Sequence, residues 1–246
     1  MEGRDSCSKR LTMYTKEQFA KMIDNTLLRP DCTKDDVVRL CEESAQRHFA
    51  SVCVLPCWVG TAARYLAECD VKVCTVVAFP FGGTTRLTKV FEIKNAVANG
   101  AKEIDAVFNI SRFKSGDYDS VAHDLAEMVE ATRKAGAAEG ARNILLKIII
   151  ETFFLTDSEK EIAARLVRDS GADFVKTSTG TVRKGASVED IRLIRRAIGP
   201  SATGIKASGG IKNVQSALQM LDAGANRIGT SSGGVIYDAY HPEEYA

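Results

Sequence analysis

The sequence predicts an α/β fold, a single (β/α)8 TIM barrel with an extra helix near its N-terminus. Its 246 residues match the length of about 250 that is typical of one such barrel. Short apolar runs with β character alternate with helical stretches along the chain. At several points a glycine that ends a helix leads directly into the next apolar run, which indicates the parallel strands and crossover helices of a barrel.

The strands are expected where apolar runs lie between turn signals. These runs are residues 22–27, 50–55, 72–79, 103–109, 144–151, 174–176, 203–206 and 227–229. Eight parallel strands favour a closed barrel over an open, doubly wound sheet.

The helices are expected between the strands, at residues 35–48, 87–99, 118–135, 157–170, 188–198 and 213–223. Three of them end in the same Gly-Ala turn, at residues 99–102, 170–173 and 223–226. A further helix at residues 15–21 precedes the first strand and is expected to cap the bottom of the barrel. Because the composition shows no break or linker, residues 13–246 are expected to form one domain after a disordered tail at residues 1–12.

Composition excludes several classes of partner. Hydrophobic residues make up 45% of the chain and charged residues 26%, which is ordinary for a globular protein in water. The net charge of +1 argues against nucleic acid or an anionic membrane as the main partner. No apolar run approaches the roughly 20 residues of a membrane span, and the polar first residues predict no secretory signal. We therefore expect a cytoplasmic protein.

All seven cysteines lie in the first third of the chain. An odd number without a secretory signal indicates free thiols in a reducing compartment. Cys53 and Cys57 are four residues apart, but no histidine is near enough to complete a familiar zinc pattern. We expect the cysteines to be small buried apolar residues, and we expect no metal site.

Two lysines in similar settings carry most of the functional argument. Lys176 stands in FVKTSTG (174–180) and Lys206 in GIKASGG (204–210), and each ends a β-like run before a Gly/Ser/Thr loop. Two buried ammonium groups side by side would repel, so one would lose its proton easily. A neutral amine is a nucleophile for carbonyl carbons, which indicates Schiff-base chemistry. Singly, Lys176 could instead be a lysine whose amine reaches solvent, and Lys206 a structural ion pair or phosphate contact.

Other polar groups are expected at the same end of the barrel. Asp105 lies within an apolar strand, where an acid is costly unless it is paired. It is either a structural partner of a lysine or a proton-relay group, and both roles are compatible. The Gly209-Gly210 loop and the loop at residues 229–234 follow the seventh and eighth strands, where barrels commonly bind phosphate. The alternative to phosphate binding is that these loops are only tight turns.

Taken together, these residues resemble the deoxyribose-phosphate aldolases, a family of class I (Schiff-base) aldolases with TIM-barrel folds. The resemblance extends over residues 23–232. It is carried by the runs IDNTL (23–27), VCV (52–54), TTRLTKVFE (84–92), EID (103–105), LKIIIET (146–152), FVKTSTG, GIKASGG and GTSS (229–232).

The resemblance implies reversible cleavage of 2-deoxy-D-ribose 5-phosphate to D-glyceraldehyde 3-phosphate and acetaldehyde. It implies that Lys176 forms the Schiff base, that Lys206 favours the neutral form of the first lysine, and that Asp105 relays protons. The implied substrate- and phosphate-binding residues are Asp24, Thr26, Cys53, Lys147, Thr179, Gly180, Gly209, Gly210, Ser231 and Ser232. It implies no metal or organic cofactor, because the iminium is the electron sink, and a homodimer or higher homo-oligomer.

The chain departs from the family pattern at several places, and three of them bear on the site. Ala78 stands where a glycine usually precedes Phe-Pro. Phe153-Phe154 follows Ile-Glu-Thr where Gly-x is common, and would narrow the pocket, shield the imine or contact a partner. Thr181 stands where a basic residue often follows the Ser-Thr-Gly loop, so that Arg183 or Lys212 would supply the charge.

Two other functions stay open. One is a different phosphate-sugar enzyme on the same barrel, either another Schiff-base aldolase or an isomerase, which would need a carboxylate base such as Glu151. The other is a non-catalytic barrel that binds a protein partner, for which the Phe153-Phe154 pair is the only indication.

Overall fold

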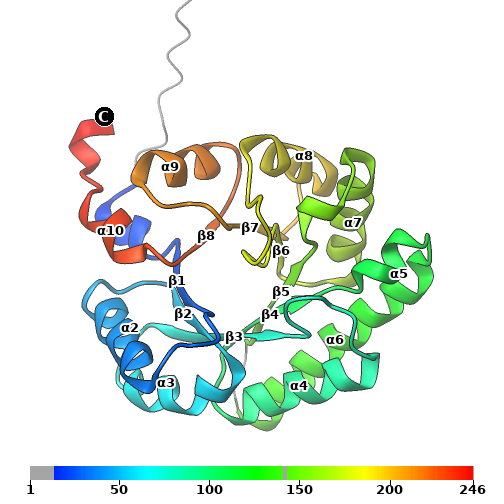
Figure 1. The fold of residues 1–246 in the computed structure, drawn as a ribbon, viewed down its shortest axis with the longest axis horizontal. Coiled ribbons are helices and arrows are strands. Elements are labelled where there is room, and N and C mark those ends of the chain that lie inside the picture. Colours follow the sequence, from blue (N-terminus) through cyan, green and yellow to red (C-terminus); the bar gives the residue numbers. More distant parts are fainter. Residues whose placement is uncertain (1–13, 141–142, 246) are drawn as a thin grey trace, which may run out of the picture.

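The computed structural model describes residues 14–140 and 143–245, so the predicted tail at residues 1–12 lies outside the described residues. Eight strands form a closed barrel in chain order, and each strand is parallel to both neighbours (Figure 1). The strands are β1 (Ile23–Leu27), β2 (Ser51–Val54), β3 (Lys72–Val77), β4 (Glu103–Val107), β5 (Leu145–Ile149), β6 (Phe174–Lys176), β7 (Gly204–Ser208) and β8 (Arg227–Thr230). The predicted TIM barrel is confirmed.

Helices surround the barrel on its outside (Figure 1). They are α1 (Lys16–Ala20), α2 (Lys34–Gln46), α3 (Val59–Tyr65), α4 (Arg86–Ala98), α5 (Ile110–Lys114), α6 (Tyr118–Ala138), α7 (Asp157–Ser170), α8 (Val188–Ile198), α9 (Val214–Asp222) and α10 (Gly233–Asp238). Most of the longer ones begin at a side chain that accepts a hydrogen bond from the first turn, as Thr33, Thr156 and Asn213 do. These caps satisfy backbone N–H groups that have no partner within the helix.

The structure differs from the sequence-based elements mainly at short helices and strand ends. Helices α3, α5 and α10 have five to seven residues, which is too short for a hydrophobic period to register. Three strands end two residues before their predicted ends, at Val77, Val107 and Ile149. The polar residues that follow, Asn109 and Glu151 among them, belong to the loops: Asn109 caps α5 and Glu151 has a left-handed backbone.

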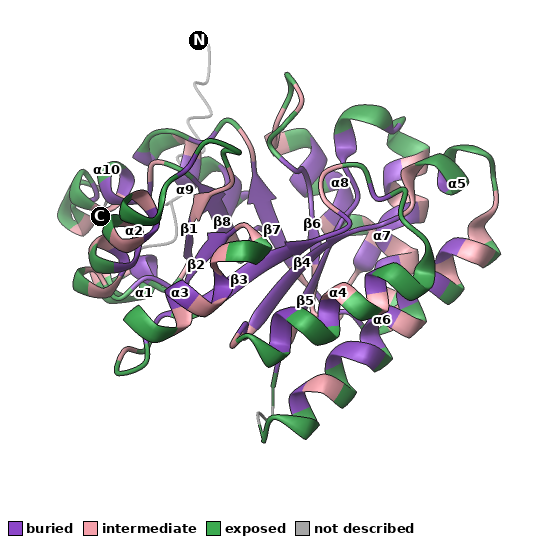
Figure 2. Cartoon of the chain, turned by 60° about the horizontal axis from the view of Figure 1, so that its bottom comes forward, coloured by how far each residue is buried: buried purple, intermediate pink, exposed green. Residues whose placement is uncertain are grey.

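Each strand presents two different faces. The face toward the helices is apolar, and Val52, Ile104 and Ile205 belong to one large buried cluster with the helices. The alternate residues point into the barrel and are largely polar. Figure 2 shows the strands buried along most of their length and the helices exposed on their outer faces. The barrel thus keeps its apolar core between strands and helices, and its interior is free to hold charged groups.

The predicted extra helix near the N-terminus is α1. It packs against α10 to one side of the ring of strands, where the rings of Phe19 and Tyr240 stack with centroids 4.1 Å apart (Figure 1). Within the described part of the chain, no helix combines the length and the apolar character needed to cross a membrane.

Candidate active site

One carboxylate holds three lysines inside the barrel. Lys176 Nζ and Lys206 Nζ each lie 2.7 Å from Asp105 Oδ2, and Lys147 Nζ lies 3.0 Å from Asp105 Oδ1. All four side chains are buried. Lys176 and Lys206 are register partners on β6 and β7, so their side chains leave the sheet in the same direction. The predicted mutual repulsion of the two lysines is therefore replaced by attraction to a shared acid.

The ion network extends to a second layer of groups that the sequence analysis did not single out as a network. Asp24 lies 2.5 Å from Lys206 Nζ and 2.5 Å from Arg227. Glu103 lies 2.5 Å from Lys147 Nζ and 3.4 Å from Arg227. Apart from thiols, this part of the described barrel brings together four cationic side chains and three carboxylates. The network thus has one more cationic side chain than carboxylates, so a single neutral amine would balance its charges.

Asp105, Asp24 and Lys206 are held in their charged forms. Burial disfavours an ionised Asp105, but Lys147, Lys176 and Lys206 together keep its pKa well below the ordinary value. Asp24 follows the same pattern: burial opposes its charge, and Arg227 and Lys206 lower its pKa. Burial alone would lower the pKa of Lys206, but Asp105 and Asp24 raise it. Lys206 is thus an ammonium group.

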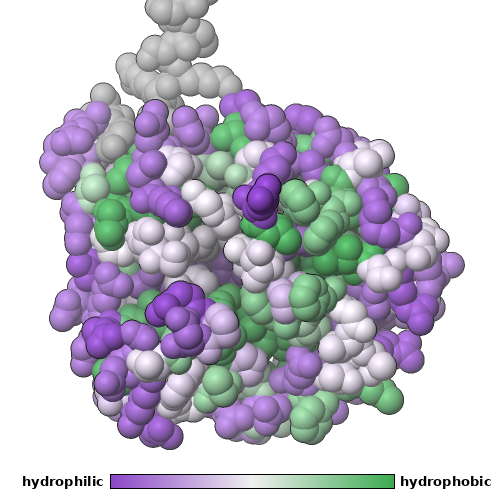
Figure 3. Space-filling model, in the orientation of Figure 1, coloured by the Kyte–Doolittle hydropathy of each residue, from purple (hydrophilic) through white to green (hydrophobic). Residues whose placement is uncertain are grey.

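A pocket of about 990 Å³ opens at the carboxyl ends of the strands, and Lys176 is part of its wall. Figure 3 shows a hollow near the centre of this face. The other predicted residues on the wall are Thr26, Thr179, Gly180, Gly209, Gly210 and Ser231. The other charged groups of the network lie beneath it: the lysines and carboxylates among them are buried, and the side chain of Arg227 is 12% exposed. Lys176 is therefore the network amine that meets the pocket.

Several predicted site residues lie below or beside the pocket. Asp24, Cys53 and Lys147 have no exposed surface and sit in the barrel interior, so they stand behind Lys176 and not on the pocket wall. Ser232 begins α10, and its N–H donates to Thr230 Oγ1 at 3.0 Å. The structure places these residues in contact with the network or the loops, and not against open pocket space.

The glycine loops on the pocket wall have the backbone that an anion site requires. Gly180, Gly209 and Gly210 have φ values of +85°, +87° and +80°, a region that residues with a Cβ adopt at a cost. Such loops can turn successive N–H groups toward one point. Lys212 also lines the pocket, whereas Arg183 is not part of its described wall. Thr181 stands where a basic residue is common, and Arg183 and Lys212 are the two candidates to supply that charge. Of these two, Lys212 is the one at the pocket.

Glu151 fixes the loop after β6. Its Oε2 accepts hydrogen bonds from the N–H of Thr179 at 3.0 Å and from Thr179 Oγ1 at 2.5 Å. Glu151 is 1% exposed and has a φ of +46°, a strained conformation for a residue other than glycine. The sequence offered this residue only as a spare base, and the structure makes it a support of the Thr179–Gly180 loop.

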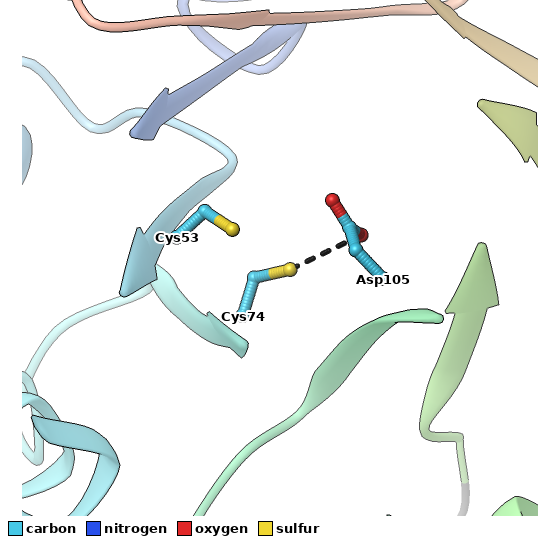
Figure 4. Close-up of side chains that lie close together, drawn as sticks. All are labelled: Cys53, Cys74 and Asp105. Carbon is cyan, nitrogen blue, oxygen red and sulfur yellow. Dashed lines mark hydrogen bonds between the residues drawn. The ribbon is translucent and has the colours of Figure 1, made fainter. Parts of the chain in front are cut away.

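Two cysteines adjoin the network. Cys74 Sγ donates to Asp105 Oδ1 at 3.2 Å, and Cys53 lies beside it (Figure 4). Burial raises the pKa of the Cys74 thiol well above its ordinary value. The neighbouring Cys74 side chain is the main cause that lowers the pKa of Cys53. The six cysteines of the described residues are all free thiols, and Cys7 lies outside them.

The aromatic pair after β5 stands away from Lys176. Phe153 and Phe154 are each 46% exposed and contact one another with centroids 5.1 Å apart. Neither belongs to the described wall of the pocket that holds Lys176, and Phe154 instead lines a separate cavity of about 350 Å³. The prediction that this pair narrows the pocket at Lys176 is therefore wrong.

Glu103 and Arg227 are the residues of the network that sequence reasoning missed. A signal for Glu103 was present, because it lies two residues before Asp105 and a strand returns to the same face every second residue. Arg227 opens the last strand, where an arginine is usually a surface residue. Only the closure of the barrel, which sets β8 against β1, brings it to Asp24.

Comparisons with known proteins match nearly the whole chain to aldolases. The profile of the DeoC/LacD family aldolases matches residues 18–239. A deoxyribose-phosphate aldolase of Thermoanaerobacter sp. (strain X514) is 49% identical over 223 residues, which cover 91% of this chain and 97% of that protein. One from Geobacillus sp. (strain WCH70) is 51% identical over 223 residues, 91% of this chain and 96% of that protein. The tetrameric deoxyribose phosphate aldolase of Aeropyrum pernix superposes with a TM-score of 0.82 at 30% identity, and the match covers 92% of each chain.

Proposed function

This chain belongs to the DeoC/LacD family of aldolases, and from that premise we propose that it cleaves 2-deoxy-D-ribose 5-phosphate reversibly through a Schiff base on Lys176. The products are D-glyceraldehyde 3-phosphate and acetaldehyde. The relatives named deoxyribose-phosphate aldolase support the substrate. The observation that carries the mechanism is that Lys176 alone among the described network amines reaches the pocket wall.

The charge balance of the network selects the nucleophile. Four cations face three carboxylates, and the pKa of Lys206 is raised. Release of one proton from Lys176 balances the network and gives an amine next to the space where a carbonyl carbon would lie. An uncharged lysine amine is the form that adds to carbonyls.

The reaction then follows in balanced steps. Lys176 Nζ adds to the aldehyde carbon of the open-chain sugar, and loss of water gives a protonated imine. The C2–C3 bond breaks as the C3 hydroxyl loses its proton, and the bond's electron pair moves toward the imine to form an enamine between C1 and C2. Glyceraldehyde 3-phosphate leaves, the enamine carbon takes up a proton, and hydrolysis releases acetaldehyde and frees Lys176.

Asp105 and Lys206 are the groups placed to handle the moving proton. Asp105 is ionised and shares one oxygen between Lys176 and Lys206, so it can accept a proton directly or through a water and pass it along the network. The iminium serves as electron sink, so the proposed chemistry needs no metal or organic cofactor. We also propose a cytoplasmic homo-oligomer, in line with the tetrameric relative.

The phosphate group is proposed to bind at the glycine loops, far from the bond that breaks. Gly180, Gly209, Gly210 and Ser231 line this part of the pocket, with Lys212 beside them. Binding energy gained there would orient C1 and the C2–C3 bond at Lys176, and orientation of this kind lowers the barrier of the chemical step.

Trapping of the imine tests the proposal. The protein is incubated with deoxyribose 5-phosphate and borohydride, and the reduced adduct is mapped by peptide mass spectrometry. A single adduct on Lys176 is the expected result. An adduct on Lys206 or Lys147 would keep the reaction class and overturn the assigned nucleophile. A folded protein that forms no adduct and turns over no substrate would favour the binding-protein alternative.

A further inference from the structure

We propose that Cys53, Cys74 and Asp105 form an inhibitory binding site for a thiophilic divalent cation, with Zn²⁺ as the ordinary example. The three residues come from the neighbouring strands β2, β3 and β4, and their side chains converge inside the barrel (Figure 4). Their ligand atoms all lie within 4.8 Å of one another, and all three residues are buried. Cys74 has no role in the proposed reaction, so this cluster is not explained by catalysis.

The donor set suits a soft metal. Two sulfur atoms and a carboxylate oxygen are common zinc ligands, with bonds of about 2.0–2.3 Å that set tetrahedral ligand atoms roughly 3.3–3.8 Å apart. Cys74 Sγ and Asp105 Oδ1 are already 3.2 Å apart. Cys53 and Cys74 are register partners on adjacent strands, so both thiols project from the same side of the sheet. Small side-chain movements are enough to bring the three ligands onto one ion.

Binding conserves charge in spite of the nearby lysines. Two S–H bonds break, two metal–sulfur bonds and one metal–oxygen bond form, and two protons pass to solvent. One divalent cation thus replaces two protons, and the net charge of the interior is unchanged. Lys147, whose Nζ lies 3.5 Å from Cys74 Sγ, meets no added net charge. The exchange involves no oxidant or reductant.

The site inhibits because it uses Asp105. Asp105 Oδ2 is the shared acceptor of Lys176 and Lys206, and a cation bound at Oδ1, beside Cys74, would withdraw electron density from the carboxylate and weaken both hydrogen bonds. This consequence rests on the proposed function of Lys176. Lys176 also lies between the pocket and the cluster, because it lines the pocket and donates to Asp105. Its side chain must move for an ion to enter, so substrate held on Lys176 should slow metal binding.

Cadmium reports binding without reference to activity. Cd²⁺ is titrated into the full chain, and the ultraviolet absorption of cadmium–thiolate bonds is followed. One equivalent is expected to give the band in the wild type, and Cys74→Ala or Cys74→Ser is expected to abolish it. Cys57→Ser, which changes an exposed cysteine of the same region, is expected to retain the band. A band that survives in both Cys74 variants, or none in the wild type, would overturn the proposal.

Zinc inhibition is measured on the same proteins. One equivalent of Zn²⁺ is expected to abolish cleavage of deoxyribose 5-phosphate by the wild type, and a chelator is expected to restore it. Each variant is compared with its own zinc-free rate. Cys57→Ser should stay sensitive and Cys74→Ala should become resistant, and equal sensitivity of the two would contradict the site. If the wild type does not cleave this sugar at all, the proposed function fails, while the cadmium titration still decides whether the site exists.

Discussion

Lys176 and Lys206 donate to the same oxygen of Asp105, each across 2.7 Å. The two amines stand opposite one another on β6 and β7, yet only Lys176 belongs to the wall of the pocket. One carboxylate oxygen thus connects an amine at the surface of the pocket with an ammonium group beneath it. The two lysines therefore have different surroundings although their local sequences are alike.

Replacement of Lys176 should abolish turnover. Lys176→Ala and Lys176→Arg are both expected to lower kcat by about 10⁴-fold or more, since neither side chain can form the imine. The arginine keeps the positive charge, so it separates loss of the nucleophile from loss of charge. Circular dichroism checks that the barrel stays folded. Appreciable turnover by a folded Lys176→Ala protein would rule out this nucleophile.

Lys206→Leu should move the acid limb of the pH–rate profile to higher pH. Its removal leaves three cations for three carboxylates, so Lys176 would keep its proton more tightly and become a nucleophile only at higher pH. Lys206→Arg preserves the charge and is expected to leave the limb near its wild-type position. The measurement is kcat/KM across the pH range for all three proteins. An unshifted limb in Lys206→Leu would show that the charge of Lys206 does not control Lys176.

Glu151→Gln should weaken binding of the phosphorylated sugar. Its carboxylate holds the Thr179 N–H and hydroxyl, and hydrogen bonds to a charged group contribute about 1.5–3 kcal/mol. KM for deoxyribose 5-phosphate is expected to rise about tenfold, since about 1.4 kcal/mol corresponds to a factor of ten. Unphosphorylated deoxyribose is the control and should change less. Equal losses with both sugars would place the effect of Glu151 at the reacting carbon and not at the phosphate loop.

Asp105 should make the stability of the protein sensitive to acid. Its pKa is lowered in the folded state, so its contribution is present above the unfolded value of about 3.9 and is lost as pH falls below it. Each such proton contributes a slope of about 1.4 kcal/mol per pH unit. Asp105→Asn should therefore reduce the slope of unfolding free energy between about pH 4 and pH 2. Asp35→Asn, at an exposed carboxylate, is the matched control, and an equal effect of both variants would contradict the assignment.

Arg227→Met should destabilise the barrel. Arg227 lies 2.5 Å from Asp24, whose side chain has no exposed surface, and removal of one partner of a buried pair costs about 3–5 kcal/mol. Denaturant unfolding measures the loss, with the exposed Arg196→Met as control. The pH–rate profile should move in the same direction as in Lys206→Leu but less, because Arg227 does not contact Asp105. An unfolding free energy equal to that of the control would show that Asp24 is satisfied by Lys206 alone.

The sequence was sufficient to predict the barrel and the central group of the site. Eight apolar runs appear in the structure as eight strands in chain order, because the period of a buried strand and a glycine turn are local properties. Lys176, Lys206 and Asp105 could be singled out because a charge inside an apolar run is rare without a purpose. All three meet at one point.

The sequence could not predict which charged residues, far apart along the chain, would pair with one another. Cys53 and Lys147 face the interior as expected of strand residues, but their depth below the pocket depends on the stagger between strands, which a sequence does not state. The raised pKa of Lys206 depends on Asp24, 182 positions earlier in the printed chain. Such long-range pairings appear only when the barrel closes.

The ion pair between Asp24 and Arg227 joins residues that are 203 positions apart, on the first and the last strand of the barrel. On a ribosome, Asp24 emerges early and its arginine only after nearly all of the chain has been made. A polypeptide that stops before β8 leaves this acid without its arginine and leaves β1 without a neighbour on one side. The ion network beneath the pocket is therefore complete only when the final strand has been made. A chain that ends before β8 should be both unstable and inactive.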